Sequence, residues 1–268
     1  MLEKLEQLRC HLRSFGPKVA IAFSGGVDST FLLRIALDEL GPDGVLALTA
    51  VSPTYPEHEQ QECRNLANLL GATQIEIDSA ELLNDGFSAN QRERCYHCKY
   101  ALFSRFQIEA QAHGCAALLD GSNVDDLGDV RPGHRALAEL EVISPLLEAR
   151  MHKAEIRQLS RELDLPTWDK QPYACLATRF PFGTRITAER LQQVDRCETV
   201  LRRFGFRNYR VRYHGDTARI EVGPGEIDRF FEAGLRETVV REFRAVGFIF
   251  VALDLEGYRT GSLNAASE

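Results

Sequence analysis

The sequence predicts an α/β protein in which a doubly wound parallel sheet is followed by a second, smaller α+β domain. Two features of the 268 residues support this fold class. Over the first two thirds, short apolar runs alternate with longer amphipathic segments, which is typical of parallel strands covered by helices. After a loop at 171–183, which contains Pro172, Pro181 and Gly183, the spacing of the apolar residues changes.

The first domain is expected to span residues 1–175. Apolar runs predict five buried strands in it, over 18–23, 44–51, 74–77, 115–119 and 142–143. Apolar residues at helical spacing predict four helices between them, over 29–40, 57–70, 97–113 and 153–163. Helix-breaking residues follow these helices in order, namely Gly41 with Pro42, Gly71, Gly114 and Pro166.

The second domain is expected to span residues 184–260. Thr187 starts a predicted helix, and two strands with alternating apolar residues follow over 209–213 and 218–222. A further helix around 226–243 and a strand over 247–253 complete a small α+β unit. The polar tail after Tyr258 is expected to be disordered.

Composition limits the classes of function. The chain carries a formal net charge of −7, which argues against a protein that mainly holds a long nucleic acid and favours a small or mononucleotide substrate. We expect a soluble cytoplasmic protein, because no apolar run has membrane-spanning length and the charged N-terminus has no signal-peptide core. Seven cysteines, an odd number, indicate a reducing compartment in which thiols serve as ligands or reagents.

A predicted phosphate loop follows the first strand. Its residues are Ser24, Gly25, Gly26, Val27, Asp28 and Ser29. The two glycines let the backbone amides approach an anion, the next helix presents its N-terminus, and the serines add hydroxyl donors. Asp28 would repel phosphate unless a cation lay between them, so Mg²⁺ is implied. The loop lacks the spacing and the Gly-Lys ending of a Walker loop. The alternative to a phosphate site is a tight strand-to-helix turn that merely needs glycine.

These six residues resemble the pyrophosphate loop of the N-type ATP pyrophosphatases. The resemblance implies that ATP is cleaved to AMP and pyrophosphate, with AMP left transiently on a substrate oxygen.

Three cysteines form the second group of candidate residues. Cys95 and Cys98 make a C-x-x-C at the start of a predicted helix, and Cys175 lies farther along the chain. A C-x-x-C alone fits a zinc site, a redox dithiol or an iron–sulfur cluster. Lys99 could steady a polyphosphate or simply extend from the helix into solvent.

Together with residues 120–126, 131–133 and 144–146, these segments resemble the sulfur transferase family of nickel-pincer cofactor synthesis, which is associated with lactate racemase maturation. The resemblance implies that a carboxylate of pyridinium-3,5-biscarboxylate mononucleotide is adenylated and that a sulfur nucleophile displaces AMP to give a thiocarboxylate. It also implies a homo-oligomer.

The family resemblance leaves the sulfur source open between two branches. In one, Cys175 gives up its own sulfur; in the other, Cys95, Cys98 and Cys175 hold a [4Fe-4S] cluster that carries an extra sulfide. We favour the cluster, because a dedicated C-x-x-C would be redundant if Cys175 acted alone. Zinc is disfavoured, because helical geometry would point His97 away from a site that the two neighbouring thiols share.

Polar residues after the 115–119 strand form a third group. Asn123, Asp125 and Asp126 follow this strand at the edge of the sheet where α/β proteins bind ligands. We expect Asn123 and Asp126 to contact the nucleotide, and the alternative is helix capping or turn formation.

A group of arginines lies in the second domain. Between residues 185 and 219, nine arginines stand against four acidic residues. Arg210 and Arg212, two apart on a predicted strand, are expected to grip the substrate phosphate from one face. The family resemblance adds Glu198 as a functional glutamate. The alternative is an exposed strand face on which these arginines pair with Glu198 or Glu221.

Other functions share parts of this pattern. A transfer-RNA-thiolating enzyme would share the loop and a three-cysteine cluster, but it would need a broad basic face. In an ammonia-using ligase the cysteines would be incidental, and a nucleotide sensor would leave them unexplained.

Overall fold

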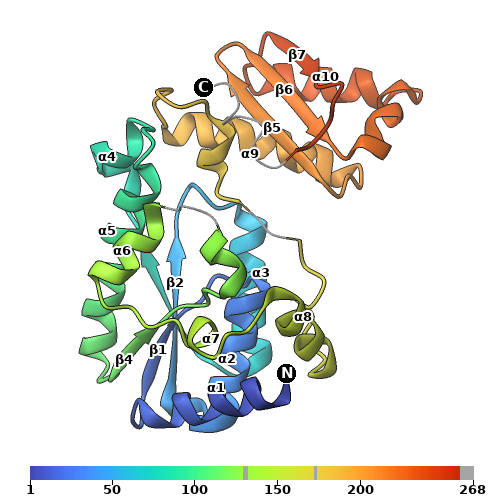
Figure 1. Cartoon of the computed structure of the whole chain (residues 1–268). Helices are drawn as coiled ribbons and strands as arrows, with labels where there is room; N and C mark the ends of the chain where they lie inside the picture. The colour runs from blue at the N-terminus through green and yellow to red at the C-terminus, as the bar shows by residue number, and fades with distance from the viewer. Residues whose placement is uncertain (129–131, 172–173, 260–268) are drawn as a thin grey trace. The chain divides into compact units, whose positions relative to one another are not determined.

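The computed structural model describes residues 1–128, 132–171 and 174–259 (Figure 1). The chain divides into two compact units: unit 1 comprises Met1–Asn84 and Glu93–Tyr173, and unit 2 comprises Asp85–Arg92 and Ala174–Glu268. The short helix α4 (Asp85–Ser88) therefore belongs to unit 2 although it precedes most of that unit by about ninety residues. Arg131 of the 131–133 segment and the tail at 260–268 lie outside the described residues.

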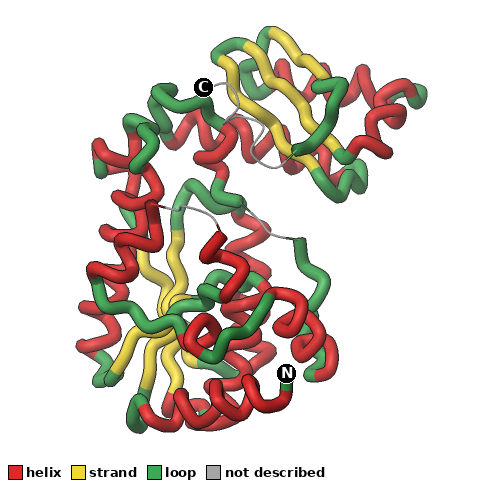
Figure 2. The backbone as a smooth tube through the Cα atoms, in the orientation of Figure 1, coloured by secondary structure: helices red, strands yellow, loops and turns green. Residues whose placement is uncertain are grey.

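Unit 1 is built on a four-stranded parallel sheet, whose strands are yellow in Figure 2. The strand order is β3-β2-β1-β4. The strands are β1 (Val19–Ala22), β2 (Val45–Val51), β3 (Thr73–Asp78) and β4 (Ala117–Leu119). The fifth predicted strand, at 142–143, is only a single parallel bridge between Leu119 and Ile143. Because β1 lies between β2 and β4, the sheet grows in opposite directions from β1, and this reversal is where α/β sheets bind ligands.

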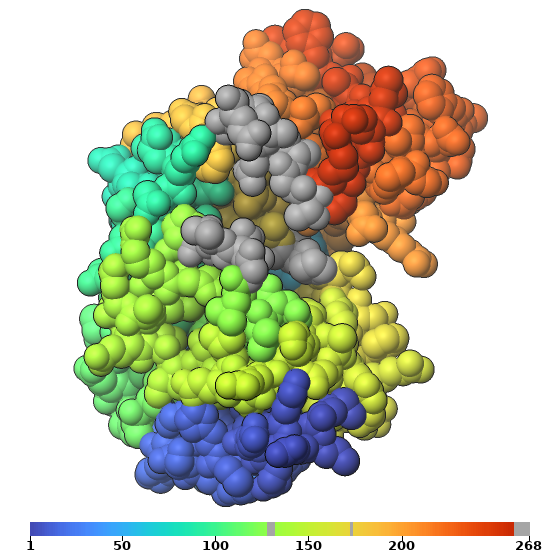
Figure 3. All heavy atoms as spheres, in the orientation of Figure 1, coloured from blue at the N-terminus to red at the C-terminus, as the bar shows by residue number. Residues whose placement is uncertain are grey.

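Helices cover both faces of this sheet. They are α1 (Leu2–Ser14), α2 (Val27–Leu40), α3 (Glu57–Leu70), α5 (Arg94–Ala112), α6 (Pro132–Glu139), α7 (Pro145–Glu148) and α8 (Lys153–Glu162). Short 3₁₀ turns η1 (Pro42–Gly44), η2 (Glu81–Leu83) and η3 (Val124–Gly128) lie between them. Helix α1 was not predicted from the sequence; it contacts α7, and Figure 3 shows it in blue at the surface.

Side chains alternate between two cores along the strands, as the pleat requires. Val19 and Ile21 of β1 face a core shared with α1, α2, α3, α7 and α8. Ala20 faces the opposite core, which contains Phe103 of α5 and Leu137 of α6. The predicted doubly wound parallel sheet is thereby confirmed.

Unit 2 contains a three-stranded mixed sheet in the order β5-β6-β7. Strand β5 (Tyr209–His214) is antiparallel to β6 (Thr217–Val222), and β7 (Phe250–Leu253) is parallel to β6. Its longer helices are α9 (Ala188–Arg203) and α10 (Leu235–Ala245), with 3₁₀ turns η4 (Leu176–Arg179) and η5 (Pro224–Phe231). The predicted helix at 226–243 is interrupted because Gly234 adopts a left-handed conformation with φ of 82° between η5 and α10.

No helix within the described ranges combines the length and the apolar character needed to cross a membrane.

Candidate functional site

The phosphate loop connects β1 to α2 and is shaped by its glycines. Gly25 has φ of +67°, and a Cβ added there would lie 3.3 Å from Cys63 Cβ, so the position requires glycine. Gly26 is the N-cap residue of α2. The Ser24 and Ser29 hydroxyls lie 3.2 Å apart, which places two donors beside the N-terminus of the helix.

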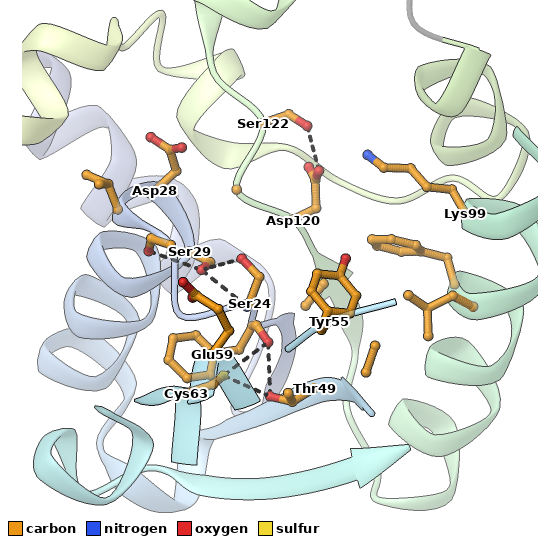
Figure 4. Close-up of a pocket in the computed structure, with 18 of the residues that line it drawn as sticks. Ser24, Asp28, Ser29, Thr49, Tyr55, Glu59, Cys63, Lys99, Asp120 and Ser122 are labelled. Atoms are coloured by element: carbon orange, nitrogen blue, oxygen red, sulfur yellow. Dashed lines mark hydrogen bonds between the residues drawn. The ribbon is translucent and has the colours of Figure 1, made fainter. Parts of the chain in front are cut away.

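A cavity of about 480 Å³ opens beside this loop, entirely within unit 1 (Figure 4). Its lining comes from the loop, from the carboxyl end of β2, from residues 120–122 after β4, from α3, α5 and α6, and from the first residue of α8. Its apolar lining includes Ala50, Phe103 and Phe106, which belong to the core on one face of the sheet, and Tyr55 lines the cavity as well. A cavity of this volume lies in the range that holds small-molecule ligands and cofactors.

Asp28 lines the cavity at the start of α2. Its Oδ2 accepts a hydrogen bond from the Lys153 ammonium, and its Oδ1 is buried without a hydrogen-bond partner among the described residues. Burial raises the pKa of the Asp28 carboxyl, while Lys153 opposes this shift and the Asp126 charge adds to it. A carboxylate oxygen with unused acceptor capacity beside a phosphate loop fits a Mg²⁺ ligand.

Of the polar residues after β4, some form a hydrogen-bonded turn and others line the cavity. The Asn123 side chain accepts from Asp125 N at 2.9 Å, and Asn123 N donates to Asp126 Oδ2 at 3.1 Å. Asp120 accepts hydrogen bonds from the hydroxyls of Ser122 and Ser144. Of this group Asp120, Ser122 and Asp126 line the cavity, whereas Asn123 is buried and braces the turn.

Asp125 caps α8. Its carboxylate accepts from the backbone amide of Lys153 and lies 3.1 Å from His152 Nδ1. The hydrogen bond from the Lys153 amide, aided by His152, lowers the pKa of the Asp125 carboxyl. The contacts of Asp125 therefore match the capping alternative.

Helix α5 supplies the opposite wall, where Cys98 and Lys99 line the cavity and Cys95 is exposed outside it. Lys99 of α5 and Asp28 of α2 both line the cavity, and Figure 4 shows them on opposite sides of it. The aliphatic part of Lys99 runs past Gly133 of α6, where an added Cβ would lie 2.8 Å from Lys99 Cδ. Gly133 therefore lets the lysine pass close to α6 on its way to the cavity.

In unit 2, Cys175 is the N-cap residue of η4 and lies beside a buried ion pair. Arg179 donates through Nη1 to the carbonyl oxygens of Ala174 at 2.8 Å and Cys175 at 3.4 Å. It also forms a bidentate pair with Glu198, at 2.8 Å from Nε to Oε1 and 2.9 Å from Nη2 to Oε2. Glu198 thus helps to fix the turn that carries Cys175.

The two arginines of β5 have different surroundings. Arg212 is buried, with Nη2 2.6 Å from Glu221 Oε2 and Nη1 3.0 Å from the Thr178 carbonyl oxygen. The Arg210 guanidinium is partly buried and lies 5.0 Å from the centre of the Tyr258 ring. Arg212 therefore has the partner Glu221 that the alternative named, but the pair is buried and does not lie on an exposed strand face.

The cysteines also differ in their surroundings. Cys95 and Cys98 lie in unit 1 and Cys175 in unit 2. Over the ranges that the structure describes, no three His, Cys, Asp or Glu side chains gather as a metal site. Burial raises the pKa of Cys63 to about 11 and also raises that of Cys197, so both thiols are protonated near neutral pH.

Comparison with known proteins places the chain in a family. A sequence model of the NAD synthase family matches residues 4–111, which contain the phosphate loop. The chain is 38% identical, over 92% of its length and 89% of the relative, to pyridinium-3,5-bisthiocarboxylic acid mononucleotide synthase of Lactiplantibacillus plantarum. The chain belongs to the family of this synthase.

Two further relatives differ in how much of the chain they match. An uncharacterized protein of Synechocystis sp. is 43% identical over 98% of both chains. Argininosuccinate synthase of Natronomonas pharaonis is 30% identical over 56% of this chain and 40% of its own length. The family resemblance drawn from the motifs is confirmed by the synthase that matches nearly the whole chain.

Two lysines that line the cavity were not predicted as site residues from the sequence. Lys153 contacts Asp28, 125 residues away, and Lys170 lies 2.8 Å from Glu59. Local spacing gives no signal for either pair, because the partners come from distant segments. A basic residue at the first position of a helix was the one available hint for Lys153.

Proposed function

We propose that this protein uses ATP and Mg²⁺ to convert carboxylates of pyridinium-3,5-biscarboxylate mononucleotide into thiocarboxylates for the nickel-pincer cofactor. One observation carries the proposal: the phosphate loop, Lys99 and Cys98 line the same cavity of about 480 Å³. The Lactiplantibacillus plantarum relative is a bisthiocarboxylic acid mononucleotide synthase, which suggests the product class.

The cavity suggests how ATP would bind. Its phosphates would accept hydrogen bonds from the loop amides at the N-terminus of α2, and its adenine would pack against aromatic residues of the lining such as Tyr55 and Phe106. Asp28 would hold Mg²⁺, which when bound would neutralise the negative charge that gathers on the pyrophosphate.

The proposed chemistry has two displacements. In the first, a substrate carboxylate oxygen attacks the α-phosphorus and the bond to the bridging oxygen breaks, so that pyrophosphate leaves. In the second, a sulfur nucleophile attacks the activated carbonyl carbon and the carbon–oxygen bond to AMP breaks. Lys99, whose ammonium group extends into the cavity, would stabilise the charge that develops on the phosphates.

The sulfur source remains part of the proposal. Thiolates are suitable ligands for iron, and Cys95 and Cys98 are separated by about one turn of α5, with Cys175 as the third cysteine. A [4Fe-4S] cluster held by these three residues would supply a sulfide for transfer. In the alternative, Cys175 would donate its own sulfur.

The phosphate of the substrate nucleotide is assigned to β5. Arg210 would make the direct contact, because its side chain is only partly buried, whereas Arg212 is buried beside Glu221. Arg212 and Glu198 would keep the strand and the Cys175 turn in place.

The decisive test is incubation with ATP, Mg²⁺, the dicarboxylate nucleotide and a sulfide source, followed by mass spectrometry of the small molecules. We expect AMP, pyrophosphate and one sulfur-for-oxygen exchange per carboxylate. Asp28→Ala should abolish all three, whereas Asp38→Ala, on the exposed end of the same helix, should not. ADP and phosphate as products would contradict the proposal.

Iron and sulfide analysis after anaerobic reconstitution separates the two sulfur sources. A colourless protein that loses activity after one turnover would favour a sacrificial Cys175.

We also propose a cytoplasmic homo-oligomer. The family resemblance and the acidic, cysteine-containing composition support this, and light scattering of the purified protein measures the assembly.

A further inference from the structure

Lys153 is an unusual residue in its position. It is the first residue of α8, where a cation lies at the positive end of the helix dipole. Its side chain is 33% exposed and lines the cavity beside the phosphate loop. A helix N-terminus favours negative charge, so a lysine at this position indicates that the residue is needed for function.

Two carboxylates offset this placement. Asp125 accepts the backbone amide of Lys153 and fixes the first turn of α8, and Asp28 accepts the ammonium group. The ammonium group has three donors, and Asp28 Oδ2 accepts one of them. Asp28 is also the residue proposed to hold Mg²⁺. Without the ion, one of its carboxylate oxygens accepts a hydrogen bond from Lys153.

We infer that Lys153 is a phosphate-binding residue. When ATP and Mg²⁺ bind, its ammonium group would leave Asp28, which then binds Mg²⁺, and would form an ion pair with the pyrophosphate portion of ATP. This inference rests on the proposed use of ATP and Mg²⁺. Before ATP binds, the Lys153–Asp28 pair is neutral and does not repel a polyphosphate. After the exchange, Lys153 would contact the leaving pyrophosphate, and Asp28 would hold Mg²⁺, which would supply further positive charge there.

A simpler role would be that Lys153 only neutralises Asp28. The two roles differ in a double-mutant cycle, because a lysine that only neutralises Asp28 has no effect once that charge is gone. We would measure binding of α,β-methylene-ATP, which cannot be cleaved between these phosphates, by calorimetry in saturating Mg²⁺. The four proteins are the wild type, Lys153→Met, Asp28→Asn and the double variant.

We expect Lys153→Met to weaken binding by about tenfold or more in the wild-type background and by a similar factor in the Asp28→Asn background. Lys153→Arg, which keeps the cation, should recover most of the affinity. Equal affinity of Asp28→Asn and the double variant would overturn the inference. Failure of the wild type to bind the analogue would instead overturn the proposed use of ATP.

Lys4→Met is the matched control. Lys4 has 30% side-chain exposure and pairs with Glu155 on the same helix α8, at 2.7 Å, but it does not line the cavity. Wild-type affinity in Lys4→Met would show that loss of an ion pair to α8 is not the cause. A tenfold loss in Lys4→Met as well would reduce Lys153 to a structural role and contradict the inference.

Discussion

Replacement of Glu198 by alanine should destabilise unit 2 strongly. The carboxylate accepts three hydrogen bonds, two from Arg179 and one from Val211 N at 2.9 Å. The side chains of Arg179 and Glu198 are 0% and 4% exposed, so water cannot replace the lost partner. Removing one member of a buried ion pair costs about 3–5 kcal/mol.

The exposed pair of Arg203 and Glu242 provides the control. Arg203 Nη2 lies 2.7 Å from both carboxylate oxygens of Glu242, but the side chains of Arg203 and Glu242 are 56% and 30% exposed. Exposed pairs contribute about 0–1 kcal/mol, so Glu242→Ala should change stability little.

Urea unfolding followed by circular dichroism measures both variants. We expect the transition assigned to unit 2 to shift to lower urea in Glu198→Ala with an unchanged slope. Replacing both Arg179 and Glu198 by apolar residues should recover part of the loss, because no buried charge is then left alone. A cost below about 1 kcal/mol for Glu198→Ala would refute the reasoning.

Three further substitutions and treatments test the geometry of unit 1. Gly25→Ala forces a side chain into the left-handed region 3.3 Å from Cys63, so unfolding should require about 1–2 kcal/mol less; an unchanged urea midpoint would contradict this. Gly133→Ala should displace Lys99, because the new Cβ would lie 2.8 Å from Lys99 Cδ. The rate at which ATP is cleaved to pyrophosphate should fall, while the melting temperature should drop by no more than a few degrees. Because burial raises the pKa of the Cys63 thiol to about 11, iodoacetamide at pH 8 should label exposed Cys95 of the iron-free protein and spare Cys63, as peptide mass spectrometry would show. Equal labelling rates would contradict the burial.

The sequence alone determined the class of the fold and the position of the phosphate loop. Strand alternation and helix-breaking residues are local signals, and the run from Ser24 to Ser29 contains every group that forms the loop turn. The loop could be predicted because its conformation depends on neighbouring residues, with Gly25 at a positive φ.

The tertiary structure decided which charged groups meet. Strand β4 pairs with β1, although it follows β3 in the chain, so Asp126 lines the same cavity as Asp28, whereas its neighbour Asp125 caps α8. The contact of Lys153 with Asp28 depends on the same topology. Spacing along the chain could not predict these partners, because ion pairs form between groups that the sheet order brings close together in space, whatever their separation in sequence.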